Sequence, residues 1–217
     1  MLKNVKWENH FKPEIAKDSI LIYYGNTDLN NLKSSINADF KCNFAKKETL
    51  SINELSHIYL NKILSELIKR EVTENDFVEN QYKKPYLQND NIFFNISHSQ
   101  NAFVIAISNF EIGIDIEENY TELNIADCMN YAFSEEEINY CKIDRLESFL
   151  TIWTLKEAYL KAIGIGLTDK LKEINCLDSR IYKTQNMKQF SFFSPNQEIC
   201  SLVYNENANN LYFNKIL

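Results

Sequence analysis

The sequence predicts an α+β fold in which antiparallel strands pack against two long helices. Residues 51–70 and 146–163 lack Gly and Pro and are rich in residues that favour helices. Residues 92–108 form two apolar runs joined by a short polar turn, which is the pattern of a β-hairpin. After residue 171, short apolar runs, including 211–213, alternate with polar turns and indicate further antiparallel strands.

Local signals in the N-terminal half predict a strand and two helices. Residues 19–24 are apolar and β-branched, as expected for a strand, and residues 28–36 can form a short helix. Ser51 begins the long helix, and Glu54 at its third position completes a capping box. Residues 1–18 are polar, so we expect an extension with little structure.

The strand predicted at 112–117 carries two carboxylates on one face. Because side chains alternate along a strand, Asp115 and Glu117 point to the same side while the isoleucines between them enter the core. Two adjacent carboxylates repel each other unless a cation lies between them. Gly113 has no Cβ and would allow another backbone or a ligand to approach closely. In most sequences such an acidic pair is simply a solvated strand edge.

The helix predicted at 146–163 carries polar candidates beside its buried stripe. The buried stripe comprises Ile152, Leu155, Tyr159 and Ile163. Trp153, Glu157 and Lys161 are spaced by four residues and share a neighbouring face, and the helix ends at Gly164. Glu157 and Lys161 could form an ordinary surface ion pair, although a Trp on the same face argues against full exposure.

The hairpin strand at 92–99 ends in small polar residues and His98. This histidine could donate a hydrogen bond to a phosphate, or it could cap the turn. The chain contains three histidines, and no second His or Cys stands at metal-ligand spacing from His98. A zinc site is therefore not expected.

The composition excludes several classes of protein. The chain of 217 residues has a formal net charge of −7, and because phosphate backbones are bound by basic surfaces, we expect no nucleic-acid partner. No apolar run approaches the length of a membrane span, and residues 1–14 lack the apolar region of a signal peptide. The five cysteines, an odd number without a C-x-x-C pair, are typical of reduced thiols in a cytoplasmic protein.

Four segments in order resemble the 4′-phosphopantetheinyl transferase superfamily, specifically its larger, two-lobed Sfp-like group. They are residues 94–99, residues 113–117, Phe133-Ser134 with Glu137, and residues 153–167. The last segment fills every position of the pattern W-x-x-K-E-A/S-x-x-K-x-x-G-x-G-L. Lys84-Pro85 also matches the G-K-P element of this family, with Lys83 in place of its Gly.

The resemblance implies a specific architecture. It predicts two pseudo-two-fold-related lobes, each an antiparallel sheet packed with a long helix. We expect residues 1–18 to form an N-terminal extension, residues 19–110 the N-terminal lobe, and residues 111–217 the C-terminal lobe with the metal site, whose sheet the last strands should finish. One chain of this length supplies both lobes, so the resemblance implies a monomer with the active site in the cleft.

The resemblance also implies the reaction. Members of this family are holo-carrier-protein synthases, which transfer the 4′-phosphopantetheine arm of coenzyme A to a serine of an apo carrier protein and release 3′,5′-ADP. The carrier would be an acyl, peptidyl or aryl carrier protein of fatty-acid or secondary-metabolite biosynthesis. Magnesium, or manganese in its place, would be the metal cofactor.

Residue-by-residue comparison with the family implies three sets of site residues. The metal ligands would be Asp115, Glu117 and Glu157. The residues at the coenzyme A site would be Lys84, Pro85, Ser97, His98, Asp115, Lys161 and His57. The catalytic residues would be Glu157 as base, with Glu117 as the alternative, and Lys161 facing charge on the leaving bisphosphate. His57 stands where the family commonly has Arg, so Lys46 or Lys47 could supply that cation instead.

Two other functions use the same residues. A magnesium-dependent phosphodiesterase or nuclease would need similar acids, but the acidic composition argues against it. A catalytically weak carrier-protein or coenzyme A binding module would keep the fold without turnover. Because carrier proteins are commonly acidic, docking on this acidic chain should depend on an apolar patch. The segment 125–140 is the candidate, although its apolar residues Met129, Tyr131, Phe133 and Ile138 could equally be core.

Overall fold

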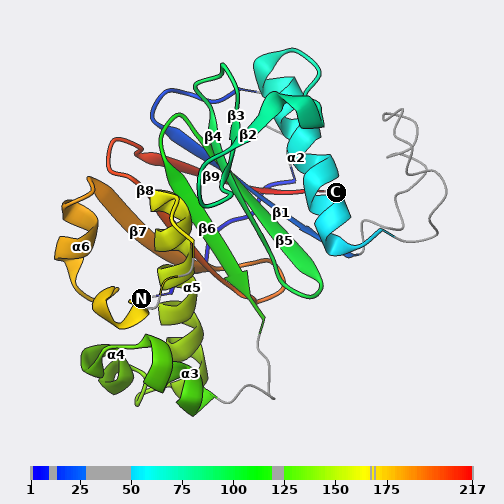
Figure 1. The fold of residues 1–217 in the computed structure, drawn as a ribbon. Coiled ribbons are helices and arrows are strands. Elements are labelled where there is room, and N and C mark those ends of the chain that lie inside the picture. The colour runs from blue at the N-terminus through cyan, green and yellow to red at the C-terminus, as the bar shows by residue number, and fades with distance from the viewer. Residues whose placement is uncertain are drawn as a thin grey trace.

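A computed structural model describes residues 2–9, 14–27, 50–118, 125–166, 168 and 170–216, and it shows the expected mixed α+β fold (Figure 1). The helices are α2 (Ile52–Ile68), α3 (Ile125–Ala132), α4 (Glu135–Tyr140), α5 (Arg145–Ile163) and α6 (Ser179–Lys183), with 3-10 turns at Glu74–Asp76 and Leu171–Glu173. The short helix expected at 28–36, and with it Lys46 and Lys47, lies outside the described residues.

Two larger sheets and one small hairpin contain the strands. The first sheet has the order β4-β5-β1-β9, the second β6-β8-β7, and β2 pairs with β3. Their bounds are β1 Ser19–Asn26, β2 Phe77–Glu79, β3 Pro85–Leu87, β4 Phe93–His98, β5 Ala102–Ser108, β6 Ile112–Glu117, β7 Met187–Phe193, β8 Ile199–Asn205 and β9 Asn210–Lys215. The hairpin predicted at 92–108 is therefore confirmed as β4 and β5, which pair antiparallel.

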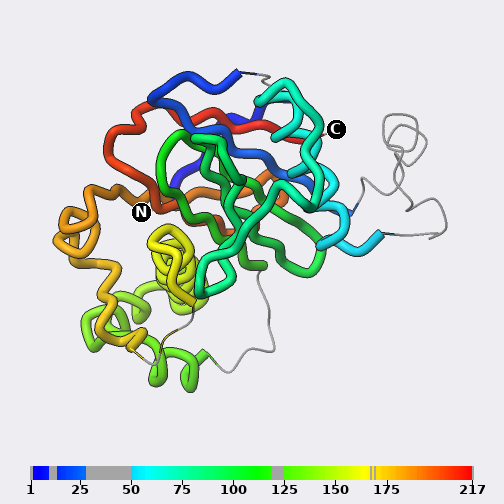
Figure 2. The backbone as a smooth tube through the Cα atoms, turned by 45° about the horizontal axis from the view of Figure 1, so that its top comes forward, coloured from blue at the N-terminus to red at the C-terminus, as the bar shows by residue number. Residues whose placement is uncertain are grey.

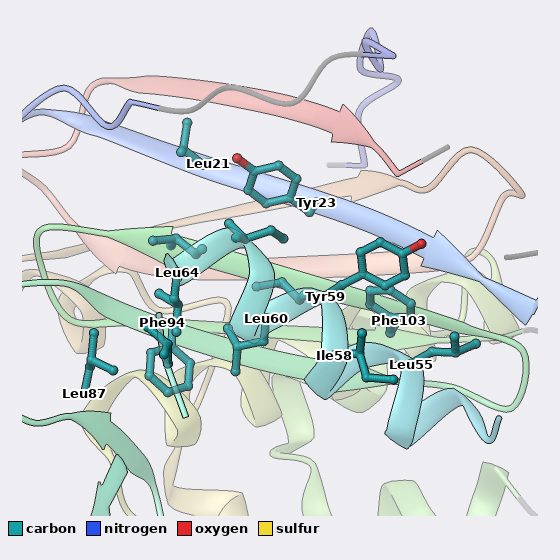
Figure 3. Close-up of a cluster of buried hydrophobic side chains, with 14 of the residues drawn as sticks. Leu21, Tyr23, Leu55, Ile58, Tyr59, Leu60, Leu64, Leu87, Phe94 and Phe103 are labelled. Carbon is teal, nitrogen blue, oxygen red and sulfur yellow. The ribbon is translucent and has the colours of Figure 1, made fainter. Parts of the chain in front are cut away.

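Helix α2 covers one face of the first sheet (Figure 3). Its start is confirmed: Glu54 donates its backbone N–H to Ser51 Oγ at 3.2 Å, and Ser51 N donates to the Glu54 carboxylate at 2.9 Å. The apolar side of the helix packs on the strands, where Tyr59 stacks on Phe103 with ring centroids 6.0 Å apart. This packing makes a first hydrophobic core between one long helix and one sheet, as the α+β pattern requires.

A second core lies between the two sheets. On this side, Ile20 and Ile22 of β1 meet Ile114 and Ile116 of β6, together with apolar residues of β7 and β8. The expected alternation of β6 is thus confirmed, because its isoleucines are buried in this core. The second sheet is therefore enclosed by the first sheet on one face and by α5 on the other.

The C-terminal strand corrects the sequence analysis. We expected residues 211–213 to finish the second sheet, but β9 pairs in parallel with β1, with Ile20 opposite Leu211 and Ile22 opposite Phe213. Leu211 and Phe213 pack in the core between the sheets, so the edge of β1 offers β9 both hydrogen bonds and apolar contacts. If the chain is divided into lobes between residues 110 and 111, the last strand of the C-terminal lobe therefore lies in the sheet of the N-terminal lobe.

The N-terminal segment is also more ordered than expected. Residues 2–9 run along both sheets: Lys3 bridges Phe192 of β7, and Glu8 bridges Asn214 of β9. Trp7 packs edge-on against Tyr24 and Phe213 and donates its indole N–H to the carbonyl of Phe193 at 3.2 Å. These residues form no helix or strand, but they are attached to both sheets, because a polar segment with one large aromatic can satisfy two sheet edges at once.

Helices α3 and α4 lie beside the first turns of α5, far from α2 in both views (Figures 1 and 2). The predicted end of α5 is confirmed, because Gly164 ends this helix with a φ of 70°. Ser134 caps α4 with Glu137 in a capping box. Among the described helices, none combines the length and the hydropathy that crossing a bilayer requires.

Candidate functional site

The close contact between β6 and α5 builds the site. A Cβ atom at Gly113 would lie 2.0 Å from the carbonyl oxygen of Ala158 and 2.4 Å from the backbone nitrogen of Ala162. Only glycine on the strand and a small residue on each turn of the helix allow this approach. The expected close approach at Gly113 is thus made by another backbone, and it sets residue 115 beside the last turns of α5.

A buried asparagine places a second strand against β6. Asn95 is in β4, which belongs to the other sheet, and its side-chain oxygen accepts a hydrogen bond from the backbone N–H of Ile114 at 2.8 Å. Ser97 lies two residues further along β4 and therefore faces the same way. This contact brings Ser97 next to Asp115. Asn95 belongs to the matched segment 94–99, but no local pattern in the sequence predicted this contact.

Three of the predicted site residues meet at this point. Lys161 donates from Nζ to Asp115 Oδ1 at 2.6 Å and to Ser97 Oγ at 2.9 Å. Ser97 Oγ in turn lies 2.7 Å from Asp115 Oδ1. The Asp115 side chain is 7% exposed and that of Lys161 is 28% exposed. The cluster is thus enclosed on the acid side and open on the lysine side.

One oxygen of the cluster has no partner. Asp115 Oδ2 is buried and makes no hydrogen bond with any described residue. Leaving a buried carboxylate oxygen unsatisfied costs about 1–3 kcal/mol or more, so native structures rarely keep one without a reason. A ligand or ion that binds here would satisfy it.

The charge of Asp115 acts on two further carboxylates, those of Glu117 and Glu157. Burial, followed by the negative charge of Asp115, raises the pKa of Glu117 to about 7, against the opposing effects of a hydrogen bond from Trp153 and the charge of Lys161. Burial and then Asp115 also raise the pKa of Glu157. The three acids are close enough to repel one another, so a cation among them would be stabilising.

These acids do not yet form a closed metal site. Within residues 2–9, 14–27, 50–118, 125–166, 168 and 170–216, no three Asp, Glu, His or Cys side chains stand together with the spacing of metal ligands. Glu157 lines a pocket beside α5, whereas Glu117 lines a separate pocket of about 230 Å³ near the start of that helix. The two glutamates therefore approach Asp115 from different sides.

The pocket beside α5 has a volume of about 280 Å³ and is rich in lysine. It is lined by residues 82–85, residues 94–96, Glu157, Leu160, Lys161 and residues 164–166. The predicted Lys84 and Pro85 are therefore here, together with Lys161. Positive side chains on its walls suit a ligand that carries several phosphates.

Lys84 is held firmly at the back of this pocket. Its ammonium donates to Glu111 at 2.7 Å and to the carbonyl oxygen of Ala162 at 3.2 Å, and its side chain is 7% exposed. Ala162 is in the last turn of α5, where unpaired carbonyls attract cations. Lys84 thus anchors the β2–β3 hairpin to the end of α5.

The two predicted histidines lie together outside this pocket. His57 in α2 and His98 at the end of β4 are both exposed, and neither is among the residues that line the pocket. Partial burial of the His57 ring, and then the nearby charge of His98, lower the pKa of His57. The structure therefore brings the two histidines near each other but not into the lysine-lined pocket.

A second lysine–carboxylate pair was missed by the sequence analysis. Lys156 Nζ lies 2.9 Å from Glu137 Oε2 and donates to the carbonyl oxygens of Leu171, at 2.9 Å, and Ile174. Glu137 also accepts from the backbone N–H groups of Ser134 and Cys176, each at 2.8 Å. A signal for this pair was present in the sequence. Glu137, the acid that follows Ser134, and Lys156 both belong to the segments that resemble the family.

The apolar residues of segment 125–140 are mostly core. Met129 and Phe133 are buried, and Ile138 packs against the same cluster. Tyr131 alone of the four candidates is exposed, at 60%, and Ile143 beyond the segment is 88% exposed. The continuous apolar docking patch considered for this segment therefore shrinks to Tyr131, with Ile143 nearby in sequence.

Known proteins match the chain across this region. Residues 111–206 match the family model described as "4'-phosphopantetheinyl transferase superfamily". The 4′-phosphopantetheinyl transferase gsp of Aneurinibacillus migulanus is 35% identical over 126 residues, which cover 55% of this chain and 52% of that protein. A putative 4′-phosphopantetheinyl transferase of Haemophilus influenzae is 30% identical over 156 residues, 67% of this chain and 61% of that protein.

A third relative belongs to the comparison because its name is that of the Sfp-like group. The 4′-phosphopantetheinyl transferase Sfp of Bacillus subtilis is 29% identical over 135 residues, which cover 59% of each chain. The matched stretches thus span between about half and three fifths of these relatives' own lengths. Residues 111–206 of this chain thus match the 4′-phosphopantetheinyl transferase superfamily, and the relatives gsp and Sfp bear the name of this transferase.

Proposed function

We propose that this protein transfers the 4′-phosphopantetheine arm of coenzyme A to a serine of an apo carrier protein and releases 3′,5′-ADP. The observation that carries the proposal is the cluster of Lys161, Ser97 and Asp115, with an unpaired buried oxygen on Asp115, beside a lysine-lined pocket. Its relatives bear the name of this transferase, which agrees with the chemistry of the cluster.

Coenzyme A would occupy the pocket beside α5. Its phosphates require positive charge, which Lys161 and the hairpin lysines among the lining residues provide. Lys84 and Pro85 would line the binding site and Ser97 would lie beside the phosphates. His98 and His57 lie outside this pocket, so they would contribute only to a part of coenzyme A that extends beyond it.

The acids of this site offer oxygen ligands that a divalent cation could draw together. Asp115 offers the unpaired Oδ2, and the mutual repulsion of Asp115, Glu117 and Glu157 would be relieved by a hard cation that takes oxygen ligands. We propose these three as ligands of Mg²⁺, with Mn²⁺ as an alternative. When bound, such an ion neutralises charge on the diphosphate and polarises its phosphorus.

The protein's own groups would then manage the proton and the leaving group. A raised pKa makes Glu157 a suitable base near neutral pH, and it would take the proton from the serine hydroxyl as the oxygen–phosphorus bond forms. Glu117 is the alternative base. Lys161 orients Asp115 and offers a compact positive charge to the departing 3′,5′-ADP.

The carrier protein would approach beside α3 and α4. With a net charge of −7 on this chain, long-range attraction to an acidic carrier is unfavourable, so apolar contact has to contribute. Tyr131 and Ile143 are exposed and would supply that contact. We further propose a cytoplasmic monomer whose lobes, 19–110 and 111–217, both contribute to the site, with β9 shared between them.

The test is direct. The protein is incubated with Mg²⁺, coenzyme A and an apo carrier protein, and the carrier is weighed by intact mass spectrometry. We expect the mass to increase by one phosphopantetheine group, and the increase to vanish with Glu157→Gln. A binding module would retain carrier or coenzyme A in calorimetry without changing the carrier's mass, and that result would overturn the proposal.

A further inference from the structure

The turn between β2 and β3 holds one lysine in an unusual backbone conformation. Lys83 has a φ of 64°, in the left-handed region that non-glycine residues rarely adopt. Such conformations persist where the surrounding structure overdetermines them, and they gather at ligand sites.

Asn80 enforces this conformation from both its backbone and its side chain. Its backbone oxygen accepts from Lys83 N at 3.0 Å, and its side-chain oxygen accepts from the backbone N–H groups of Tyr82 and Lys84, each at 2.9 Å. Its side-chain nitrogen donates to the carbonyl oxygen of Gly164, at the end of α5, at 2.8 Å. The turn is therefore rigidly attached to the helix that carries Glu157 and Lys161.

Lys83 is the lysine of the pocket that remains available. Of the three lysines that line it, Lys84 is paired with Glu111 and Lys161 with Asp115. Lys83 is exposed, and no described residue forms an ion pair with its ammonium. Lys83 thus brings to the pocket lining a charge that no described residue neutralises.

This inference rests on the proposed function, because coenzyme A carries two separate groups of phosphates. Lys161, which is paired with Asp115, and Glu157 line the pocket and would face the diphosphate where it reacts. The 3′-phosphate of the ribose needs a cation elsewhere, and His57 is not among the residues that line this pocket. We propose that Lys83 binds the 3′-phosphate and sets the preference for coenzyme A over its 3′-dephospho form.

The variant Lys83→Gly separates this role from a structural one. Glycine adopts the left-handed conformation without strain, so the melting temperature should stay the same or rise by about 1–3 °C. Affinity for coenzyme A, measured by calorimetry with Mg²⁺ present, should fall about tenfold as one charge-assisted contact is lost. Affinity for 3′-dephospho-coenzyme A should not change, and Lys83→Arg should keep the preference.

The chain provides a matched control. Lys69, which ends α2, has a φ of 57° and is exposed, but it does not line the pocket. Lys69→Gly removes the same charge and the same strain, and it should leave both affinities unchanged.

Three results would overturn the inference. Equal coenzyme A binding by Lys83→Gly and the wild type excludes a role for Lys83, and an equal loss for both ligands excludes the assignment to the 3′-phosphate. An equal loss in Lys69→Gly shows that net charge alone is responsible. All three presuppose that the wild-type protein binds coenzyme A, and a wild type that does not bind it would instead refute the proposed function.

Discussion

Helix α5 carries two lysines, five residues apart, that each pair with a carboxylate from another element, and the two pairs have opposite surroundings. In one region, Lys156 and Glu137 lie 2.9 Å apart with side chains 1% and 0% exposed. In the other, Lys161 and Asp115 lie 2.6 Å apart with side chains 28% and 7% exposed. Both pairs belong to the sequence pattern of one family, so the pattern alone does not distinguish them.

What separates the regions is how completely the carboxylate is satisfied. Both oxygens of Glu137 have partners, and Lys156 also holds two carbonyl oxygens of the segment after α5. Asp115 keeps one buried oxygen without any partner among the described residues, and its lysine faces a pocket. A saturated pair stabilises the fold, whereas an unsaturated pair at a pocket is prepared for a ligand.

The largest effect should come from breaking the saturated pair. Lys156→Met leaves the Glu137 carboxylate buried without its cation and should cost about 3–5 kcal/mol of the free energy of unfolding. Urea denaturation measures the loss. The double variant Lys156→Met with Glu137→Gln should recover part of it, because the amide oxygen still accepts backbone hydrogen bonds. A single variant as stable as the wild type would contradict the assigned role.

The second prediction concerns activity without loss of stability. Glu157→Gln should lower the rate of carrier modification about 100- to 1,000-fold, because it removes the proposed base and a metal ligand. The raised pKa of Glu157 means that its charge is unfavourable in the folded protein, so the variant should be at least as stable at neutral pH. A Glu157→Gln variant that stays active and unfolds more easily would show that this region serves stability rather than catalysis.

The third prediction tests the close contact between β6 and α5 at Gly113, which sets Asp115 beside Lys161. Gly113→Ala places a Cβ atom against backbone atoms of Ala158 and Ala162, which cannot rotate away. Forcing β6 and α5 apart should cost about 1–3 kcal/mol and also reduce activity, because Asp115 and Lys161 come from the two elements. The matched change Gly166→Ala meets no atom within 4 Å and should be nearly neutral in the denaturation assay.

The smallest expected effect is a pH dependence specific to the unsaturated region. In the folded protein the pKa of Glu117 is raised to about 7 from its ordinary value of 4.5, so between these values the folded state holds a proton that the unfolded chain has released. Stability of the metal-free protein should therefore decrease as pH rises from about 5 to about 8. Glu117→Gln should show a flatter profile in urea denaturation with chelator, and parallel profiles would exclude this origin.

Local patterns were sufficient for the elements on which the site is built. The capping box at Ser51, the glycine that ends α5 and the alternation of β6 are interactions between residues close in sequence, and the structure shows all three. The order of the matched segments likewise indicated the superfamily whose model matches residues 111–206. Interactions of this range depend on few residues and are therefore readable in a single sequence.

Contacts between segments that are distant in sequence could not be predicted from such local patterns. Residues 2–9 were expected to have little structure, yet Trp7 finds a pocket of aromatic rings that exists only after both sheets have formed. Residues 211–213 have the pattern of a strand, but a period of two does not say which sheet edge a strand joins. The apolar residues of 125–140 fit core and surface equally until α5 packs against them.

The amino-acid sequence alone determined the two long helices, the hairpin of β4 and β5, the strand β6 and the kinds of side chain available for phosphate and metal chemistry, because hydrogen bonds within a few residues and hydrophobic periodicity decide them. Only the tertiary structure decided which of two lysines on one helix is buried for stability and which faces a pocket. That choice depends on which distant carboxylate and carbonyl oxygens surround each ammonium after the chain has closed around it.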